Sequence, residues 1–159
     1  MISQAERYIR SPVGTLHLRA NIDGIQSVNF VKIVPKVGHG YHTHNQANLW
    51  IERLEQQLNE YFDGDLKTFD VPLVTVGTEF QKEVWAALRE IPFGGTWSYR
   101  QLAERVGRPR GYQAVGQANS RNPHAIVVPC HRVVQANGSI GGYAGGVERK
   151  KWLLKHESS

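Results

Sequence analysis

The residues with the clearest potential for chemistry are Cys130 and the two basic residues that follow it, His131 and Arg132. Cys130 is the only cysteine of the 159 residues, so the chain cannot form an internal disulfide. The apolar run 126–128 is expected to be a buried strand that holds the sulfur at its end, and Pro129 stiffens the backbone between them. The positive charges are expected to lower the thiol pKa from about 8.5. Such a thiolate would be a positioned nucleophile, although most buried cysteines are inert packing residues.

Around this cysteine the chain resembles the family of O6-alkylguanine-DNA alkyltransferases. The string Pro129–Val133 (Pro-Cys-His-Arg-Val) matches the active-site signature of that family. The match continues through Asn122–Pro123 upstream and through Tyr143–Gly146 and Trp152–Glu157 downstream. It is close over about residues 78–157 and holds only in outline before them. A cysteine–histidine pair alone would be weak support, but the whole ordered set is specific.

The resemblance implies a DNA repair protein that transfers the alkyl group of O6-alkylguanine, and of O4-alkylthymine, irreversibly to its own Cys130. The target base would be flipped out of the duplex, and each molecule would react once, without a cofactor. The main alternative is a non-catalytic sensor of alkylated DNA, but the sensors among such relatives replace the cysteine that is present here. A thiol hydrolase or a winged-helix regulator would each explain only some of the motifs.

By resemblance, five residues form the catalytic set. Cys130 accepts the alkyl group, His131 is the base that generates the thiolate through a water, and Glu157 orients His131 and balances its charge. Tyr99 donates a proton or a hydrogen bond to the departing guanine, and Asn122 ties together the backbone around the site. From the residues alone, Glu157 also fits a packed C-terminal helix, Tyr99 an aromatic position in a first helical turn, and Asn122 a helix end.

The resemblance also implies a guanine pocket walled by the glycine-rich loop 138–146. Its lining would comprise Tyr143, Ala144, Gly145 and Val133. Some relatives have serine where this chain has Ala144, which can offer only its backbone amide to guanine O6. Without the resemblance, the glycines of the loop would be read as simple turns.

Charge is unevenly distributed along the chain. Residues 1–78 hold 7 Lys and Arg against 8 Asp and Glu, a net charge of −1, whereas residues 79–159 hold 12 against 6, a net charge of +6. A solvated basic face would explain this asymmetry, and so would a C-terminal half that binds double-stranded DNA. No apolar run approaches the ~20 residues of a membrane span, and no signal peptide is evident. A lone cysteine fits a reducing compartment, so we expect a cytoplasmic monomer with no membrane partner.

The pattern of elements predicts an α+β chain of two domains. Residues 1–73 are expected to form an antiparallel hairpin sheet plus one helix, and the resemblance implies that they make up a small α/β domain with a scaffold role. The segment 66–77 is the expected connector. Residues 74–159 are expected to form a helical domain with a winged helix-turn-helix-like unit, which binds DNA and carries the alkyl acceptor.

Local signals specify the elements of the first domain. Alternating apolar residues over 5–31 and the Asp23–Gly24 turn predict a strand hairpin. Apolar residues at three- and four-residue spacing over 47–62 predict a helix that packs on the hairpin and is closed by Gly64. The segment 32–44 carries three histidines, for which we favour a polar loop over a metal site: His39, His42 and His44.

Two capping boxes, Thr78–Gln81 and Ser98–Gln101, mark helix starts in the second domain. A third helix is predicted from Tyr112 to about Ser120, after a basic turn, in the outline of a helix-turn-helix. An ordinary helical hairpin has the same outline. The slim, polar third helix, including Ala118 and Asn119, could approach a groove closely, and arginines beside it could bind phosphates. The expected DNA contacts are Gln113, Ala114, Gly116, Gln117, Arg108, Arg110, Arg121 and Tyr99.

The resemblance places the third helix in the minor groove, with little sequence specificity. The family usually has an arginine on this helix that fills the space left by the flipped base, and the matching residue here is Gln113. Glutamine is shorter and uncharged. We therefore expect weaker capture of flipped bases in duplex DNA.

Overall fold

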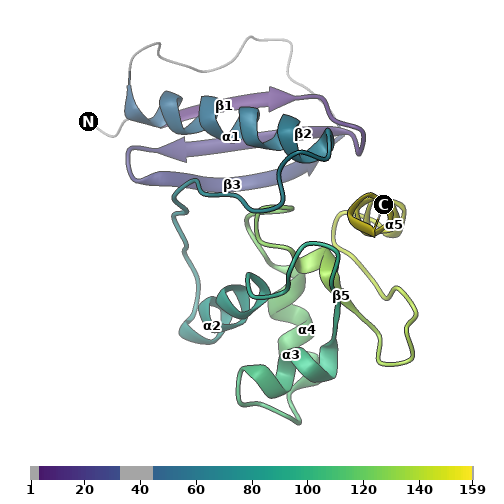
Figure 1. Ribbon diagram of the computed structural model, residues 1–159. Helices are drawn as coiled ribbons and strands as arrows, with labels where there is room; N and C mark the ends of the chain where they lie inside the picture. Colours follow the sequence, from purple (N-terminus) through teal and green to yellow (C-terminus); the bar gives the residue numbers. More distant parts are fainter. Residues whose placement is uncertain (1–3, 33–44, 159) are drawn as a thin grey trace. The chain divides into compact units, whose positions relative to one another are not determined.

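The chain divides into two compact units, Met1–Thr75 and Val76–Ser159. The structure, a computed structural model, describes residues 4–32 and 45–158 (Figure 1). The expected domain boundary, after residue 73, lies just before this division. The three histidines of the segment 32–44 fall outside the described residues. No helix in the described part of the chain is long and apolar enough to cross a membrane.

The first unit is a three-stranded antiparallel sheet with one helix across its face (Figure 1). The strands follow one another in the order β1 (Gln4–Ile9), β2 (Thr15–Asn21) and β3 (Gly24–Val31). The predicted alternation is confirmed in β2, where every second side chain is fully buried. Helix α1 (Gln46–Phe62) packs against all three strands. Its buried apolar residues are Ala47, Ile51, Leu54, Leu58 and Tyr61.

The segment 66–75 is more than a connector, because it completes the first unit. The backbone N–H of Ile25 donates to Pro72 O (2.8 Å), and the N–H of Val74 donates to Ile25 O (2.8 Å). These bonds pair the segment with the start of β3. The side chains of Phe69 and Val71 are buried, so this part of the chain also contributes to the core.

The second unit is mainly helical. Its elements are α2 (Glu79–Leu88), β4 (Trp97–Ser98), α3 (Tyr99–Arg105), α4 (Tyr112–Ser120), the 3-10 turn η1 (Cys130–Arg132), β5 (Val133–Val134) and α5 (Val147–Ser158). Both predicted capping boxes are confirmed, at the starts of α2 and α3. Strands β4 and β5 pair in parallel. The expected α+β class is confirmed, with α3 and α4 in the helix-turn-helix order and a short sheet formed by β4, just before α3, and β5, just after η1.

Helix α4 buries one side and exposes the other. Ala118 and Asn119 were expected on the exposed side, but both are buried together with Val115, because three- and four-residue spacing puts them on one face. Trp85 Nε1 donates to Ala118 O (2.8 Å) and fastens this face to α2. The exposed side of α4 therefore carries fewer polar groups than predicted.

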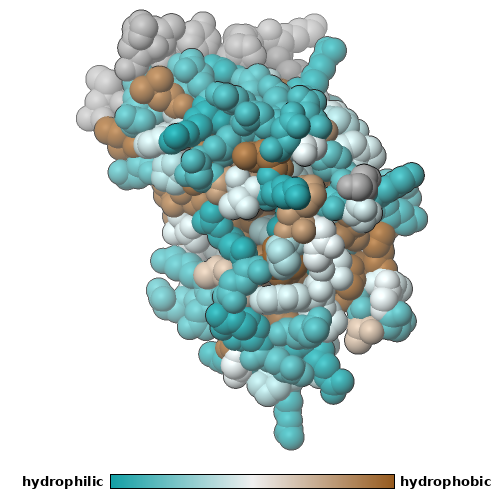
Figure 2. All heavy atoms as spheres, viewed as in Figure 1, coloured by the Kyte–Doolittle hydropathy of each residue, from teal (hydrophilic) through white to brown (hydrophobic). Residues whose placement is uncertain are grey.

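In the view of Figure 2 the surface is mostly hydrophilic, with hydrophobic residues in small separate areas.

Candidate active site

Cys130 follows a tightly folded loop, so the strand predicted over 126–128 is wrong. A three-residue turn is centred on Ile126, whose φ is 72°, and a 2.8 Å backbone hydrogen bond closes it. A second turn is centred on Pro129, whose φ of −82° and ψ of 63° are those of an inverse γ-turn. A β-branched residue with a left-handed φ is strained. Contacts from outside the loop must therefore hold this conformation.

The side chain of Asn122 supplies several of those contacts. Its Oδ1 accepts from the N–H of His124 (2.9 Å), and its Nδ2 lies within donating distance of Val128 O (2.7 Å), His124 O (3.3 Å) and Cys130 Sγ (3.2 Å). An amide nitrogen has only two hydrogens, so these three acceptors share them. Asn122 thus ties the two ends of the loop to each other and points a donor at the sulfur.

The Cys130 thiol is buried, with only 7% of the residue exposed. Burial raises its pKa above the usual value, since a thiolate loses solvation there. Four effects oppose this one: a hydrogen bond from Asn122, the positive charge of Lys150, a backbone hydrogen bond at Cys130 itself and the nearby Tyr143 side chain. The expectation of a lowered pKa is therefore wrong for the resting thiol. The two basic residues that follow it in sequence are not the source of the positive field.

His131 and Arg132 are instead engaged with Glu157. His131 Nε2 lies 2.7 Å from Glu157 Oε2, and Arg132 donates to both carboxylate oxygens (2.7 and 3.0 Å) and to Ile91 O (2.7 Å). Burial alone would raise the pKa of Glu157, but hydrogen bonds from His131 and Arg132 outweigh it and hold that pKa at about 2, so Glu157 is ionised. Burial lowers the pKa of His131. Arg132 therefore neutralises Glu157, and His131 can stay uncharged.

This pairing decides which nitrogen of His131 is basic. When Nε2 carries the hydrogen and donates it to Glu157, Nδ1 keeps its lone pair. Within the described residues, Nδ1 is buried and has no hydrogen-bond partner. Nδ1 is thus a proton acceptor inside the unit.

Sequence reasoning missed Lys150, which is completely buried. Its Nζ donates to Val133 O (2.6 Å) and to Gly142 O (3.0 Å), and burial lowers its pKa to about 8. A signal was available, because Lys150 lies three and seven residues before Leu153 and Glu157, on the buried face of α5. A lysine on a buried helix face is rare unless it has partners.

Two tyrosines border the thiol. Burial raises the pKa of Tyr99 and that of Tyr143, and the nearby Cys130 raises both further, so both hydroxyls keep their protons. Asn119, which was expected on the surface that approaches DNA, instead hydrogen-bonds with Tyr99 and donates from Nδ2 to Cys130 O (3.4 Å). The inward turn of α4 therefore brings a polar side chain to the site.

The expected pocket residues are placed unequally. Tyr143 reaches the sulfur, and the buried Val133 contacts the site through its carbonyl and Lys150. Gly145 is half-buried and accepts from Arg149 Nη1 (2.9 Å), while Ala144 is exposed. The described contacts therefore connect Tyr143 and Val133 to the surroundings of Cys130 and leave Gly145 and Ala144 at the edge of the site.

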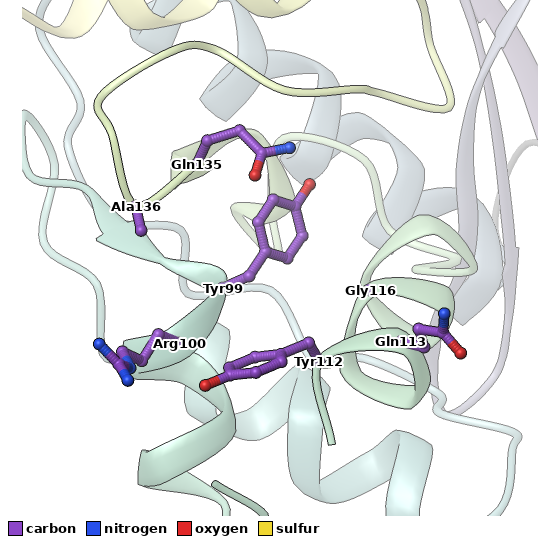
Figure 3. A pocket seen from close by; sticks show the side chains of 7 residues that line it. All are labelled: Tyr99, Arg100, Tyr112, Gln113, Gly116, Gln135 and Ala136. Atoms are coloured by element: carbon purple, nitrogen blue, oxygen red, sulfur yellow. The ribbon is translucent and has the colours of Figure 1, made fainter. Parts of the chain in front are cut away.

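The expected DNA-contacting residues lie mostly on the surface. Gly116 and Tyr99 are half-buried, and the others are exposed: Gln113, Ala114, Gln117, Arg108, Arg110 and Arg121. The starts of α3 and α4 border a hollow of about 560 Å³ that contains Tyr99, Gln113 and Gly116 in its lining (Figure 3). Tyr99 thus faces both this hollow and the thiol.

Family models cover nearly the whole chain. Residues 79–159 match the model of the 6-O-methylguanine DNA methyltransferase DNA binding domain, and residues 5–75 match that of the 6-O-methylguanine DNA methyltransferase ribonuclease-like domain. The two matches meet where the chain divides into its units. Fold and site together therefore define a DNA-binding methyltransferase.

Individual relatives agree with both models. A protein from Methanosarcina acetivorans is 46% identical over 155 residues, covering 94% of this chain and 95% of the relative. One from Mycobacterium tuberculosis is 41% identical over 153 residues, covering 96% and 92%. Both are named methylated-DNA–protein-cysteine methyltransferase. The structure of Mycobacterium tuberculosis OGT in complex with DNA is similar, with a TM-score of 0.84, 40% identity and coverage of 96% and 92%. The chain belongs to the methylated-DNA–protein-cysteine methyltransferase family of DNA repair proteins.

Proposed function

We propose that the chain transfers the alkyl group of O6-alkylguanine in DNA, and of O4-alkylthymine, to Cys130 Sγ, irreversibly and once per molecule. The observation that carries the proposal is the surroundings of the lone thiol. The amide donor of Asn122 (3.2 Å), the cation of Lys150 and the Tyr143 side chain all act on it. A cysteine that served only for packing would need none of them.

His131 is the base that removes the thiol proton. Its lowered pKa leaves the ring neutral near pH 7, and the bond to Glu157 leaves Nδ1 free to accept. A water relays the proton from Cys130 to His131. Because burial raises the pKa of Cys130, few thiolates would form without this base.

The transfer is an in-line displacement. Cys130 Sγ forms a bond to the alkyl carbon while the bond from that carbon to guanine O6 breaks, and the electron pair leaves with guanine. Tyr99 donates a proton or a hydrogen bond to the departing base. The proton that His131 took from Cys130 then passes on, either to guanine itself or to Tyr99 if Tyr99 has given up its own, so that guanine leaves neutral. The product is a thioether, which thiol reductants do not cleave. The protein is therefore consumed.

The alkyl group is buried in the base stack of a duplex, so the target base must rotate out before it can react. We propose that a monomer places α4 in the minor groove with little sequence specificity, and that the first unit serves as a scaffold. Exposed arginines next to α4 fit phosphate contacts: Arg108, Arg110 and Arg121. Gln113 fills the space left by the base without adding charge, which weakens capture in duplex DNA.

The test uses an excess of a duplex that contains one O6-methylguanine, followed by digestion to nucleosides and quantification of the lesion. Each protein molecule is expected to convert one O6-methylguanine to guanine and then stop. A sensor of alkylated DNA would bind the duplex and convert none. A thiol hydrolase would convert many lesions per molecule and release methanol.

A further inference from the structure

The hollow at the starts of α3 and α4 has an aromatic side chain whose role the proposed reaction does not explain. Tyr112, the first residue of α4, is 43% exposed. Among the described residues it is the only Phe, Tyr or Trp that is exposed. Its ring lines the hollow together with Arg100, Gln113 and Gln135 (Figure 3). The hollow is therefore both aromatic and rich in polar groups.

This chemistry fits a nucleotide. Bases stack on aromatic rings with little regard to sequence, and arginine binds phosphate. In Figure 3 the Tyr112 ring extends toward Arg100, while the Tyr99 ring points toward Gln135. The floor includes Gly116, where an added Cβ would make only an ordinary contact of 3.9 Å with Tyr99 Cε1. Packing of α4 thus does not require the glycine, and its smallness keeps the hollow open.

The position of Tyr99 indicates which nucleotide would fit. One side of this residue lines the hollow, and Lys150 Nζ, which is bonded to Val133 O beside the active site, lies 6.0 Å from its ring. The hollow is therefore next to the space in which the target base must react. A strand that delivers a guanine to Cys130 would place an adjoining nucleotide here.

We propose that the hollow binds the nucleotide that adjoins the alkylated base in the same strand, with its base stacked on Tyr112 and its phosphate facing Arg100. The proposal rests on alkyl transfer to Cys130 from DNA. Stacking on Tyr112 then contributes to DNA binding and offsets part of the affinity that is lost because Gln113 carries no charge.

The test compares single-turnover rates of the wild type, Tyr112→Ala and Tyr112→Phe on a duplex with one O6-methylguanine, at subsaturating protein. Tyr112→Ala is expected to react about tenfold more slowly, the effect of one lost base–aromatic stack, and Tyr112→Phe at nearly the wild-type rate. Val147→Ala, at a position of similar exposure (41%) on α5, is the matched surface control and should leave the rate unchanged. Unchanged melting temperatures would verify folding of all variants.

Two further duplexes identify the occupant, one lacking the base on the 5′ side of the lesion and one lacking the base on the 3′ side. The ratio of wild-type to Tyr112→Ala rates should stay near tenfold on one of them and fall to about one on the other. An equal ratio on all three duplexes, or a ratio of one on the intact duplex, would overturn the proposal. If the wild type itself fails to react with the intact duplex, the proposed alkyl transfer is what fails.

Discussion

The two units differ in whether they bury charge: among the described residues both have ion pairs that are exposed to solvent, but only the second unit also has a buried cluster of charges. In the first unit the described ion pairs keep part of each side chain in solvent, as in Arg7–Glu55 (2.7 Å; 24% and 32% exposed) and Arg53–Asp70 (3.8 Å; 51% and 65% exposed). In the second unit, Glu157 and its partners are at most 7% exposed. Lys150 is also fully buried there.

The buried charges surround Cys130, where we propose that the chemistry takes place. Partly exposed pairs add little to stability, and buried charges cost desolvation energy that an apolar core would avoid. The second unit therefore accepts an unfavourable arrangement around Cys130. In the proposed reaction, the gain is a neutral base, a counter-charge and a cation held at fixed positions around the thiol.

The largest expected effect is on the stability of the second unit. Glu157→Gln removes the counter-charge of the buried Arg132, so the free energy of unfolding should fall by about 3–5 kcal/mol. The matched change in the first unit, Glu55→Gln, should cost less than about 1 kcal/mol because the pair with Arg7 is partly exposed. Urea titrations of both variants provide the measurement. Equal losses would show that the contrast in burial has no energetic meaning.

The buried charge of Glu157 should also make the free energy of unfolding depend on pH. The pKa of Glu157 in the folded chain, about 2, is below its ordinary 4.5, so folding favours the ionised form. The resulting stability is complete above pH 4.5 and is lost as the pH falls toward 2, by about 3 kcal/mol. The pKa of His131 is also lowered, so its protonation below about pH 6.5 favours the unfolded state as well. Denaturation between pH 7 and pH 3 should show this slope, reduced in Glu157→Gln; an unchanged slope would contradict the assignment.

Removal of the buried cation should affect the reaction more than a change to its neighbour. Lys150→Met removes a charge that lowers the pKa of Cys130, so alkyl transfer near pH 7 should slow by about tenfold and recover at higher pH. Lys151→Met is the matched control, since this side chain is largely exposed and forms an ion pair with Glu148 (3.6 Å). Rate–pH profiles of both variants make the comparison. A parallel drop at every pH would assign Lys150 a purely structural role.

The smallest expected effect is that of Gly116→Ala, which should raise the stability of the second unit but lower the rate of reaction with DNA. Gly116→Ala should stabilise the second unit by up to about 1 kcal/mol, since alanine favours a helix interior over glycine. The same methyl group would narrow the hollow beside Tyr99, so reaction with duplex DNA should become severalfold slower. A thermal melt and a single-turnover assay test both signs. A more stable variant with an undiminished rate would show that the hollow is not used.

Local signals in the sequence predicted much of this fold. Thr78 and Ser98 cap the helices they were expected to cap, and the helix from Tyr112 to Ser120 has the predicted bounds. The loop before Cys130 was misread because an apolar run of this length resembles a buried strand. Its turns depend on the side-chain hydrogen bonds of Asn122, which periodicity cannot reveal.

The pKa values and the burial of the site residues were harder to predict than which residues form the site. The resemblance named Cys130, His131 and Glu157, and the structure places them in one buried region. It could not show that burial outweighs the nearby positive charge and raises the thiol pKa. Nor could it distinguish the buried Lys150 from the exposed Lys151. Both facts depend on solvent access, which only the packed chain defines.

The most direct test of the central claim is the intact mass of the protein after reaction with a duplex that carries one O6-methylguanine. The account predicts a gain of one methylene group, limited to one equivalent, located by peptide mapping on Cys130 and absent in Cys130→Ala. An unchanged mass in a protein that binds the duplex, or a methyl group on any other residue, would contradict it.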